Sequence, residues 1–180
     1  MRSGWVLEPA NGTFDVTVAP GEDVQAAVIR CPRGGCVLLL PGTHAGPLML
    51  ASGMEVHVFG RGQATLQTEK VVTLISAAAR ATIDGLIMPE RQVTAAAGLA
   101  GGQGLLGGVW ILGGSLHLQA CDLSSGILVY GGANVAPVIV KCRFMGPELG
   151  RGRIFGPDIA HFVAFCRANV ELYRNINEFI

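Results

Sequence analysis

Charged residues are scarce in this chain: only 14% of its 180 residues are Asp, Glu, Lys or Arg, and 13 basic side chains balance 13 acidic ones. No basic stripe stands out, so we expect no nucleic-acid partner. Apolar runs stay shorter than the roughly 18 residues of a membrane helix, and the first residues lack the apolar core of a signal peptide. We therefore expect a soluble, cytoplasmic protein without membrane association.

Cysteine is present, but not in the pattern of a metal site. A zinc site needs a second pair of ligands at short spacing, and a disulfide framework is typical of secreted chains. We therefore expect no metal and no cofactor, and we interpret the buried cysteines as small hydrophobic residues. The five cysteines, of which only the first two are close in sequence, are Cys31, Cys36, Cys121, Cys142 and Cys166.

Hydrophobic residues, at 50%, and 26 glycines dominate what is present. This composition favours many short buried strands joined by tight turns. Units with a short apolar run, a Gly-containing turn and a second run recur about every 16 to 22 residues, which suits one solenoid coil per unit. Residues 36–53 and 126–146 are two of these units. They are too short for a strand plus a crossover helix, which argues against a doubly wound sheet.

The pattern predicts one all-β domain, a single-stranded parallel β-helix of about five or six short coils over residues 36–146. A Gly/Ala-rich insertion at about 89–108 interrupts the coils. Residues 22–32 are predicted to form a capping helix at the first coil. Residues 156–178 are predicted to form an amphipathic helix, with one apolar stripe at Ile159, Phe162, Val163, Cys166, Val170, Tyr173 and Ile176.

A resemblance to a known family follows from two passages. DVQAAVIRCPRGGCVLLLPGTHAG resembles the entry to right-handed parallel β-helix proteins of the pectin-lyase-like fold, in which a capping helix precedes the first strand. GILVYGGANVAPVIVKCRF is similar to coils of the carbohydrate-binding and sugar-hydrolase β-helix family. The resemblance covers residues 22–146 and implies a right-handed solenoid, with a glycan as one expected ligand. It leaves function open, because the fold carries lyases, hydrolases and non-enzymatic modules.

Catalytic residues are not indicated. Glycoside hydrolysis needs a pair of carboxylates at a set separation, and a calcium site needs several that converge. Asp84 and Asp122 are the only aspartates inside the repeats, at roughly comparable points of neighbouring units. They are candidate polar ligands; the alternative is that they form turns or face solvent. We expect no catalytic residue and no metal ligand.

An outward apolar face is the candidate site. When the units are aligned on Gly42, Gly60, Gly113 and Gly131, the residues one and three positions before each glycine should point away from the interior. These positions are almost all apolar, and such a patch would exceed what monomers usually expose. The C-terminal helix, a second copy of the chain or a sugar could cover it. The predicted interaction face consists of Leu39, His57, Phe59, Trp110, Leu112, Leu128 and Tyr130.

The sequence thus predicts a non-catalytic protein-interaction or scaffold module that uses a strand face. Its expected partner is another protein or a second copy of itself, as a homodimer. The alternative is a carbohydrate-binding protein or a degenerate polysaccharide lyase or hydrolase, as the family resemblance implies.

Overall fold

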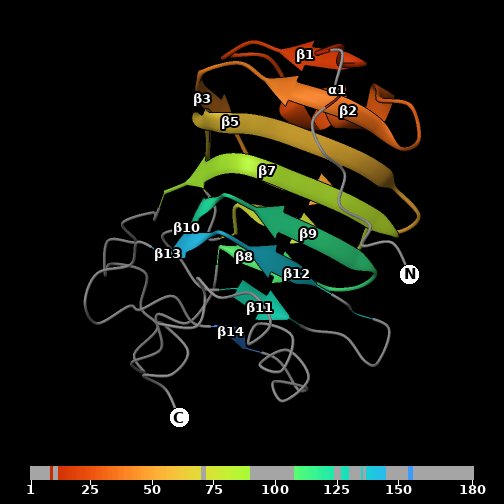
Figure 1. The fold of residues 1–180 in the computed structure, drawn as a ribbon, viewed down its shortest axis with the longest axis vertical. Helices are drawn as coiled ribbons and strands as arrows, with labels where there is room; N and C mark the ends of the chain where they lie inside the picture. Colours follow the sequence, from red (N-terminus) through yellow and green to blue (C-terminus); the bar gives the residue numbers. More distant parts are fainter. Residues whose placement is uncertain are drawn as a thin grey trace.

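Short parallel strands stacked on one another make up the computed structural model of this protein (Figure 1). The structure describes residues 9, 12–69, 72–89, 108–123, 127–129, 135, 137–144 and 154–155. Among these residues, the strand pairings that build the stacks are parallel. The chain passes from β1 to β2 through the helix α1, whereas from β2 to β7 the crossovers between paired strands consist of the other strands and turns of a coil, as in a solenoid.

The first stack forms one long face of the molecule. Its strands pair in the order β1, β2, β5, β7, β9 and β12. β5 and β7 continue around a corner, so only their first halves belong to this stack. The bounds are β1 (Val16–Val18), β2 (Gly35–Leu39), β5 (Glu55–Gln67), β7 (Arg80–Met88), β9 (Ser115–Gln119) and β12 (Val138–Val140).

Two further stacks complete each coil. The second contains the last parts of β5 and β7 together with β3, β10 and β13, and it is continuous with the first stack in one sheet. The third stack is a separate sheet in the order β4, β6, β8, β11 and β14. The bounds are β3 (Gly42–Ala45), β10 (Asp122–Leu123), β13 (Arg143–Phe144), β4 (Leu48–Leu50), β6 (Leu74–Ser76), β8 (Val109–Ile111), β11 (Ile127–Val129) and β14 (Ile154–Phe155).

From β2 to β12 the chain returns to the first stack through β5, β7 and β9, which gives a parallel β-solenoid of about four turns. The predicted all-β parallel β-helix is therefore confirmed, with about four turns where the sequence predicted five or six coils. In the described part of the chain, no helix is long and apolar enough to cross a membrane.

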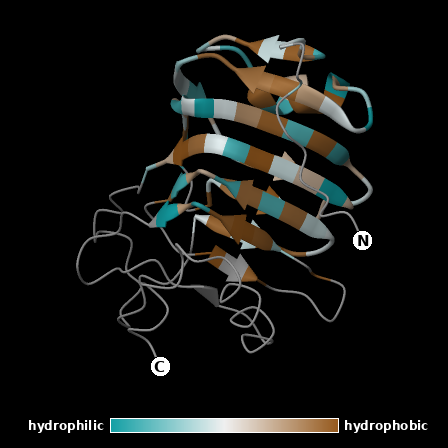
Figure 2. Ribbon diagram, viewed as in Figure 1, coloured by the Kyte–Doolittle hydropathy of each residue, from teal (hydrophilic) through white to brown (hydrophobic). Residues whose placement is uncertain are grey.

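The interior of the solenoid is filled by ladders of aliphatic side chains. Alternate residues of the first-stack strands point inward, and hydrophobic and hydrophilic segments alternate along β5 and β7 in Figure 2. Full burial of one such side chain stabilises the fold by about 1.5–3 kcal/mol. One ladder, in which each residue pairs with the next and all are 0% exposed, is Val37, Val58, Ile83, Leu118 and Ile139.

Two interior cysteines stack at one corner of the solenoid. Cys121 is fully buried, Cys142 is 6% exposed, and both belong to the main hydrophobic core. The Cys121 thiol donates to the Gln119 carbonyl at 3.2 Å, and its contact with Cys142 and its burial raise its pKa well above the ordinary value. Both cysteines pack as small residues of the hydrophobic core, as the sequence predicted.

The corner between the first and second stacks uses left-handed backbone conformations. Gly85, Ala120 and Lys141 follow strand positions that pair with one another, and their φ angles are 65°, 50° and 54°. Such a conformation costs a residue with a Cβ about 1–2 kcal/mol. The corner is therefore a property of the coil geometry, and glycine occupies it in only one of these three coils.

The glycines used for the alignment do not share one corner. Gly42 pairs with Ala64, whereas Leu38 pairs with Phe59. Gly42 is thus four residues after Leu38, but Ala64 is five residues after Phe59, so β5 has an extra residue at this corner. Gly60 is only one residue after Phe59, whereas Gly42 is four residues after Leu38, so the prediction that Gly42 and Gly60 occupy the same place in their coils is wrong.

The helix α1 (Val24–Arg30) confirms the predicted cap. The Asp23 side chain accepts a hydrogen bond from the Ala26 backbone N–H at 2.9 Å, which satisfies one of the free donors at the helix start. Gln25 exchanges two hydrogen bonds with the Met49 backbone, at 2.7 and 2.9 Å, and so occupies the edge of β4. The buried face is Val24, Ala27 and Val28; Ile29, the next residue, is 67% exposed.

Two of the predicted segments cannot be compared with the structure. The C-terminal helix over 156–178 and all but the first and last residues of the 89–108 insertion lie outside the described residues. They stay predictions.

Candidate functional site

The first stack carries a row of polar side chains on its outward surface. His57 pairs with Cys36 in β2 and with Thr82 in β7, and Thr82 pairs with His117 in β9. Because parallel strands lie about 4.8 Å apart, these side chains form one column across the coils. The predicted outward position of His57 is consistent with this column, which is polar where the sequence predicted an apolar face.

The two histidines of this column are neutral. Burial lowers the pKa of His57, and the nearby positive charge of Arg80 lowers it further. The same two causes lower the pKa of His117. The His57 side chain is buried, and its Nδ1 has no hydrogen-bond partner among the described residues. A neutral, buried imidazole here supports packing more readily than acid–base chemistry.

Phe59 is covered by the N-terminal segment that precedes β1. The Phe14 ring meets the Phe59 ring edge to face, with the centroids 5.7 Å apart. The Arg61 guanidinium lies 5.3 Å from the centre of the Phe14 ring, in a cation–π contact. Phe59 is consequently only 2% exposed. The sequence prediction placed Phe59 outward but did not include Phe14. The available signal was an aromatic residue shortly before the strand β1.

Leu39 belongs to the interior, which corrects the predicted interaction face. It is 1% exposed and part of the main core, with Val37 two residues before it. Leu38 instead occupies the outward position next to Phe59. Leu38 lies four residues before Gly42 but pairs with Phe59, which lies one residue before Gly60, so the glycine alignment was displaced by three residues. A shift by an odd number of residues reverses the face of every side chain in a strand.

A thiol pair lies beside the start of β2. The Asp15 carboxylate accepts a hydrogen bond from the Cys36 backbone N–H at 2.7 Å. Burial and the Asp15 charge raise the pKa of Cys31 to about 11 and also raise the pKa of Cys36. Both thiols are therefore protonated at neutral pH, and a thiol in that state is a poor nucleophile and a poor metal ligand.

The third stack carries an apolar row on its outward surface. Met49 pairs with Ile75, and Ile75 pairs with Trp110. Each is the central residue of a three-residue strand whose first residue is buried in the core, and all three are at least partly exposed, Met49 at 52%. The register continues through β11 and β14. We call these register partners the third-stack row, of which the side chains of the first three are described as outward: Met49, Ile75, Trp110, Leu128 and Phe155.

The predicted interaction face is thus divided between two sheets. His57 and Phe59 lie on the first stack, whereas Trp110 and Leu128 lie on the third. Leu112, directly after β8, is 40% exposed. Tyr130 falls outside the part of the chain that the structure describes. Gly60 lies within β5 and Gly113 comes shortly after β8, a strand of the other sheet, so their alignment joined residues from two surfaces.

The predicted interaction face contained neither Met49 nor Ile75, two members of the third-stack row. The signal was present: LML, LIS and VWI are short runs with an outward middle residue, and ILV pairs with VWI in register. Their spacing along the chain is irregular, because the strands start at residues 48, 74, 109 and 127, and the 89–108 segment separates β7 from β8.

The two candidate aspartates do not form a pair. Asp84 lies opposite Gln119, which donates to it at 3.1 Å, whereas Asp122 lies opposite Ile87 on the other side of the corner. Arg143 donates to both Asp122 carboxylate oxygens, at 2.6 and 2.7 Å. Asp84 and Asp122 therefore do not occupy comparable points of neighbouring coils, and each has its own partner.

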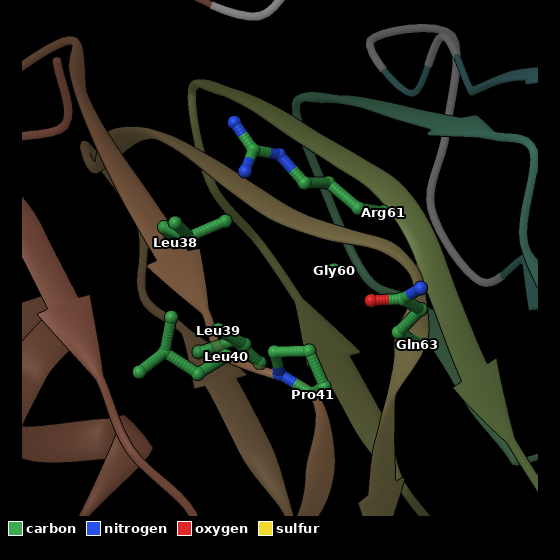
Figure 3. A pocket seen from close by; sticks show the side chains of 7 residues that line it. All are labelled: Leu38, Leu39, Leu40, Pro41, Gly60, Arg61 and Gln63. Carbon is green, nitrogen blue, oxygen red and sulfur yellow. The ribbon is translucent and has the colours of Figure 1, made fainter. Parts of the chain in front are cut away.

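A small hollow lies at the corner of the first two coils (Figure 3). Its volume is about 60 Å³, well below the roughly 300 Å³ at which small-molecule sites begin. Among the described residues, no group of three or more His, Cys, Asp or Glu side chains is placed to hold a metal ion. The hollow is lined by Leu38, Leu39, Leu40, Pro41, Gly60, Arg61 and Gln63.

No protein-family model, curated protein or solved structure matches this chain. The architecture and the two outward rows are therefore the basis for any statement about function.

Proposed function

We propose that this protein is a non-catalytic interaction module that binds another protein chain through the third-stack row. The observation that carries the proposal is the composition of the row. Met49, Ile75 and Trp110 follow one another across three coils with no polar or charged side chain between them. An outward sheet surface that faces only water usually alternates with polar residues, and a contiguous apolar surface commonly marks an interface.

A non-catalytic role is supported by the engagement of the available carboxylates. Asp84 accepts from Gln119, and Asp122 is held by Arg143 in a two-point ion pair. A pair of free carboxylates on either side of a sugar bond, which glycoside hydrolysis requires, is not formed by these two residues.

The partner that we propose is a second copy of the chain. A straight, uncharged row can pack against the same row of another copy around a two-fold axis, because each side chain then meets an apolar counterpart. Trp110 lies at the centre of the row, where large aromatic side chains contribute most to an interface.

Sedimentation velocity of the full chain over a range of concentrations tests this proposal. We expect a monomer–dimer equilibrium that Ile75→Asn weakens by about tenfold or more, which corresponds to about 1.4 kcal/mol. Ile87→Asn is the matched control, because Ile87 is a similarly half-buried strand residue on the second stack. A chain that stays monomeric, or equal effects of the two substitutions, would contradict the proposal.

Carbohydrate binding is the alternative function, and one feature favours it. The Trp110 indole N–H is buried and has no acceptor among the described residues, so a sugar hydroxyl stacked on this surface could accept from it. A glycan-array screen tests this alternative. Binding that Trp110→Ser removes and Ile87→Asn leaves unchanged would support it over self-association.

A further inference from the structure

The third-stack row ends where the chain leaves the solenoid. Phe155 is the last residue of β14, and it pairs with Leu128, which pairs with Trp110. Residues 156–180 follow directly, so the segment after the last coil starts at one end of the row. Met49 marks the other end, next to α1.

The dimensions of the row and of the following segment agree. The five strands of the third stack are separated by four spacings of about 4.8 Å, which gives a row about 19 Å long. The apolar stripe predicted from the sequence runs from Ile159 to Ile176. A helix over these residues would be about 27 Å long at a rise of about 1.5 Å per residue. One helix is therefore long enough to cross every strand of the row.

The connection between the row and the stripe is short. Only Gly156, Pro157 and Asp158 separate Phe155 from Ile159. A short linker holds an attached segment at an effective concentration of about millimolar. At ordinary protein concentrations the segment of the same chain therefore reaches the row before that of a second copy.

We propose that residues 156–180 pack as an amphipathic helix on the third-stack row of their own chain and thereby compete with its protein partner. The inference rests on the proposed function in one respect: the competition requires that the row also binds a second copy. The contact within one chain stands without that condition. The C-terminal segment is then an inhibitory element, and dimerisation requires its displacement.

Substitution of the stripe in the full chain tests the competition. We expect Phe162→Ser to free the row and to tighten the monomer–dimer equilibrium by about tenfold or more, since binding strengthens as the competent fraction rises. His161→Ser, one residue earlier on the predicted polar side, is the matched control and should leave the equilibrium unchanged. A weaker dimer after Phe162→Ser would mean that the segment bridges two copies, which overturns the inference. Equal behaviour of the two variants would also overturn it.

Photo-crosslinking tests the contact independently of any dimer. A photoreactive phenylalanine analogue is introduced at Ile75 of the full chain, and at Ile87 as the control, and irradiated at low protein concentration. Tryptic peptides of the monomer-size product are then identified by mass spectrometry. We expect Ile75, and not Ile87, to link to a peptide from residues 154–180.

The outcomes separate the two proposals. A monomer-size product linked to 154–180 in a chain that never dimerises supports the helix contact and refutes the proposed function. A dimer linked through another segment supports the proposed function and refutes the contact. A monomer-size product without a link to 154–180 refutes the contact as well.

Discussion

Replacement of Gly114 by alanine is the sharpest test of how the coils stack. Gly114 turns the chain from β8 into β9, and its φ of +64° lies in the left-handed region. A Cβ at this position would lie 1.8 Å from the carbonyl oxygen of Ala78, which belongs to the preceding coil. The same oxygen accepts the Ser115 backbone N–H at 3.3 Å. The backbone of one coil would therefore have to move away from the other.

The magnitude follows from four contributions to the free energy of unfolding. The left-handed conformation costs alanine about 1–2 kcal/mol, and the lower entropy of the unfolded alanine chain offsets about 0.4–1 kcal/mol of this cost. The displaced Ala78 carbonyl loses its hydrogen bond, which costs about 1 kcal/mol. The disturbed packing of neighbouring core residues costs about 1–3 kcal/mol in addition. We expect a total loss of about 3 kcal/mol in the free energy of unfolding, or about 6–12 °C in Tm for a chain of this length.

Gly53→Ala is the matched control, because Gly53 has a φ of +82° but no atom within 4 Å of its added Cβ. It should lose only about 1 kcal/mol, the cost of the backbone conformation. Urea unfolding followed by circular dichroism, with thermal melts in parallel, measures both variants. If Gly114→Ala lost no more than Gly53→Ala, the contact between the β8–β9 turn and Ala78 would be wrong, and with it the register of these two coils.

Two further predictions concern the corner and the polar column. Ala120→Gly should stabilise the fold by up to about 1 kcal/mol, because glycine adopts the left-handed φ of Ala120 without a Cβ penalty. Ala51→Gly is the control: Ala51 lies at an exposed turn outside that conformation, so this substitution should destabilise the fold. Urea unfolding measures both variants, and a loss of stability in both would contradict the left-handed conformation assigned to Ala120. The pKa of His57 is lowered in the folded state. Below the ordinary histidine pKa of about 6.5, the unfolded chain therefore binds more protons at this residue than the folded chain does. The free energy of unfolding should be highest above that pH and should fall as the pH drops through the folded-state pKa of His57. Unfolding measured at neutral and mildly acidic pH should show a smaller loss for His57→Gln than for the unsubstituted chain, and an equal loss would remove His57 as a cause.

Much of the fold was accessible from the sequence because it depends on local patterns. Alternating apolar residues, turns at short intervals and units too short for a crossover helix predict a parallel solenoid. Acidic residues ahead of Val24 predict the start of the capping helix, and Asp23 indeed caps it. Cys121 and Cys142 end similar apolar runs, and they do stack in the interior.

The candidate site was less accessible, because it depends on which strands become neighbours. His57 and Trp110 occupy similar positions in similar local sequences, yet β5 and β8 belong to different sheets. The local sequence indicates that a side chain points out of the core, but it does not indicate on which of the three stacks that side chain lies. The number of residues at each corner decides that assignment, and it differs from coil to coil.

By itself, then, the sequence determined the architecture of this protein. Apolar residues alternate along short units that are preceded by a capping helix, and a parallel solenoid is the arrangement that buries these residues. The tertiary structure alone decided the surfaces. The β2–β5 register, which pairs Val37 with Val58 and Leu38 with Phe59, placed Leu39 inward and Leu38 outward, since side chains alternate strictly along a strand. The pairing of β4, β6, β8, β11 and β14 brought together, from five distant segments, a row that no single segment predicts.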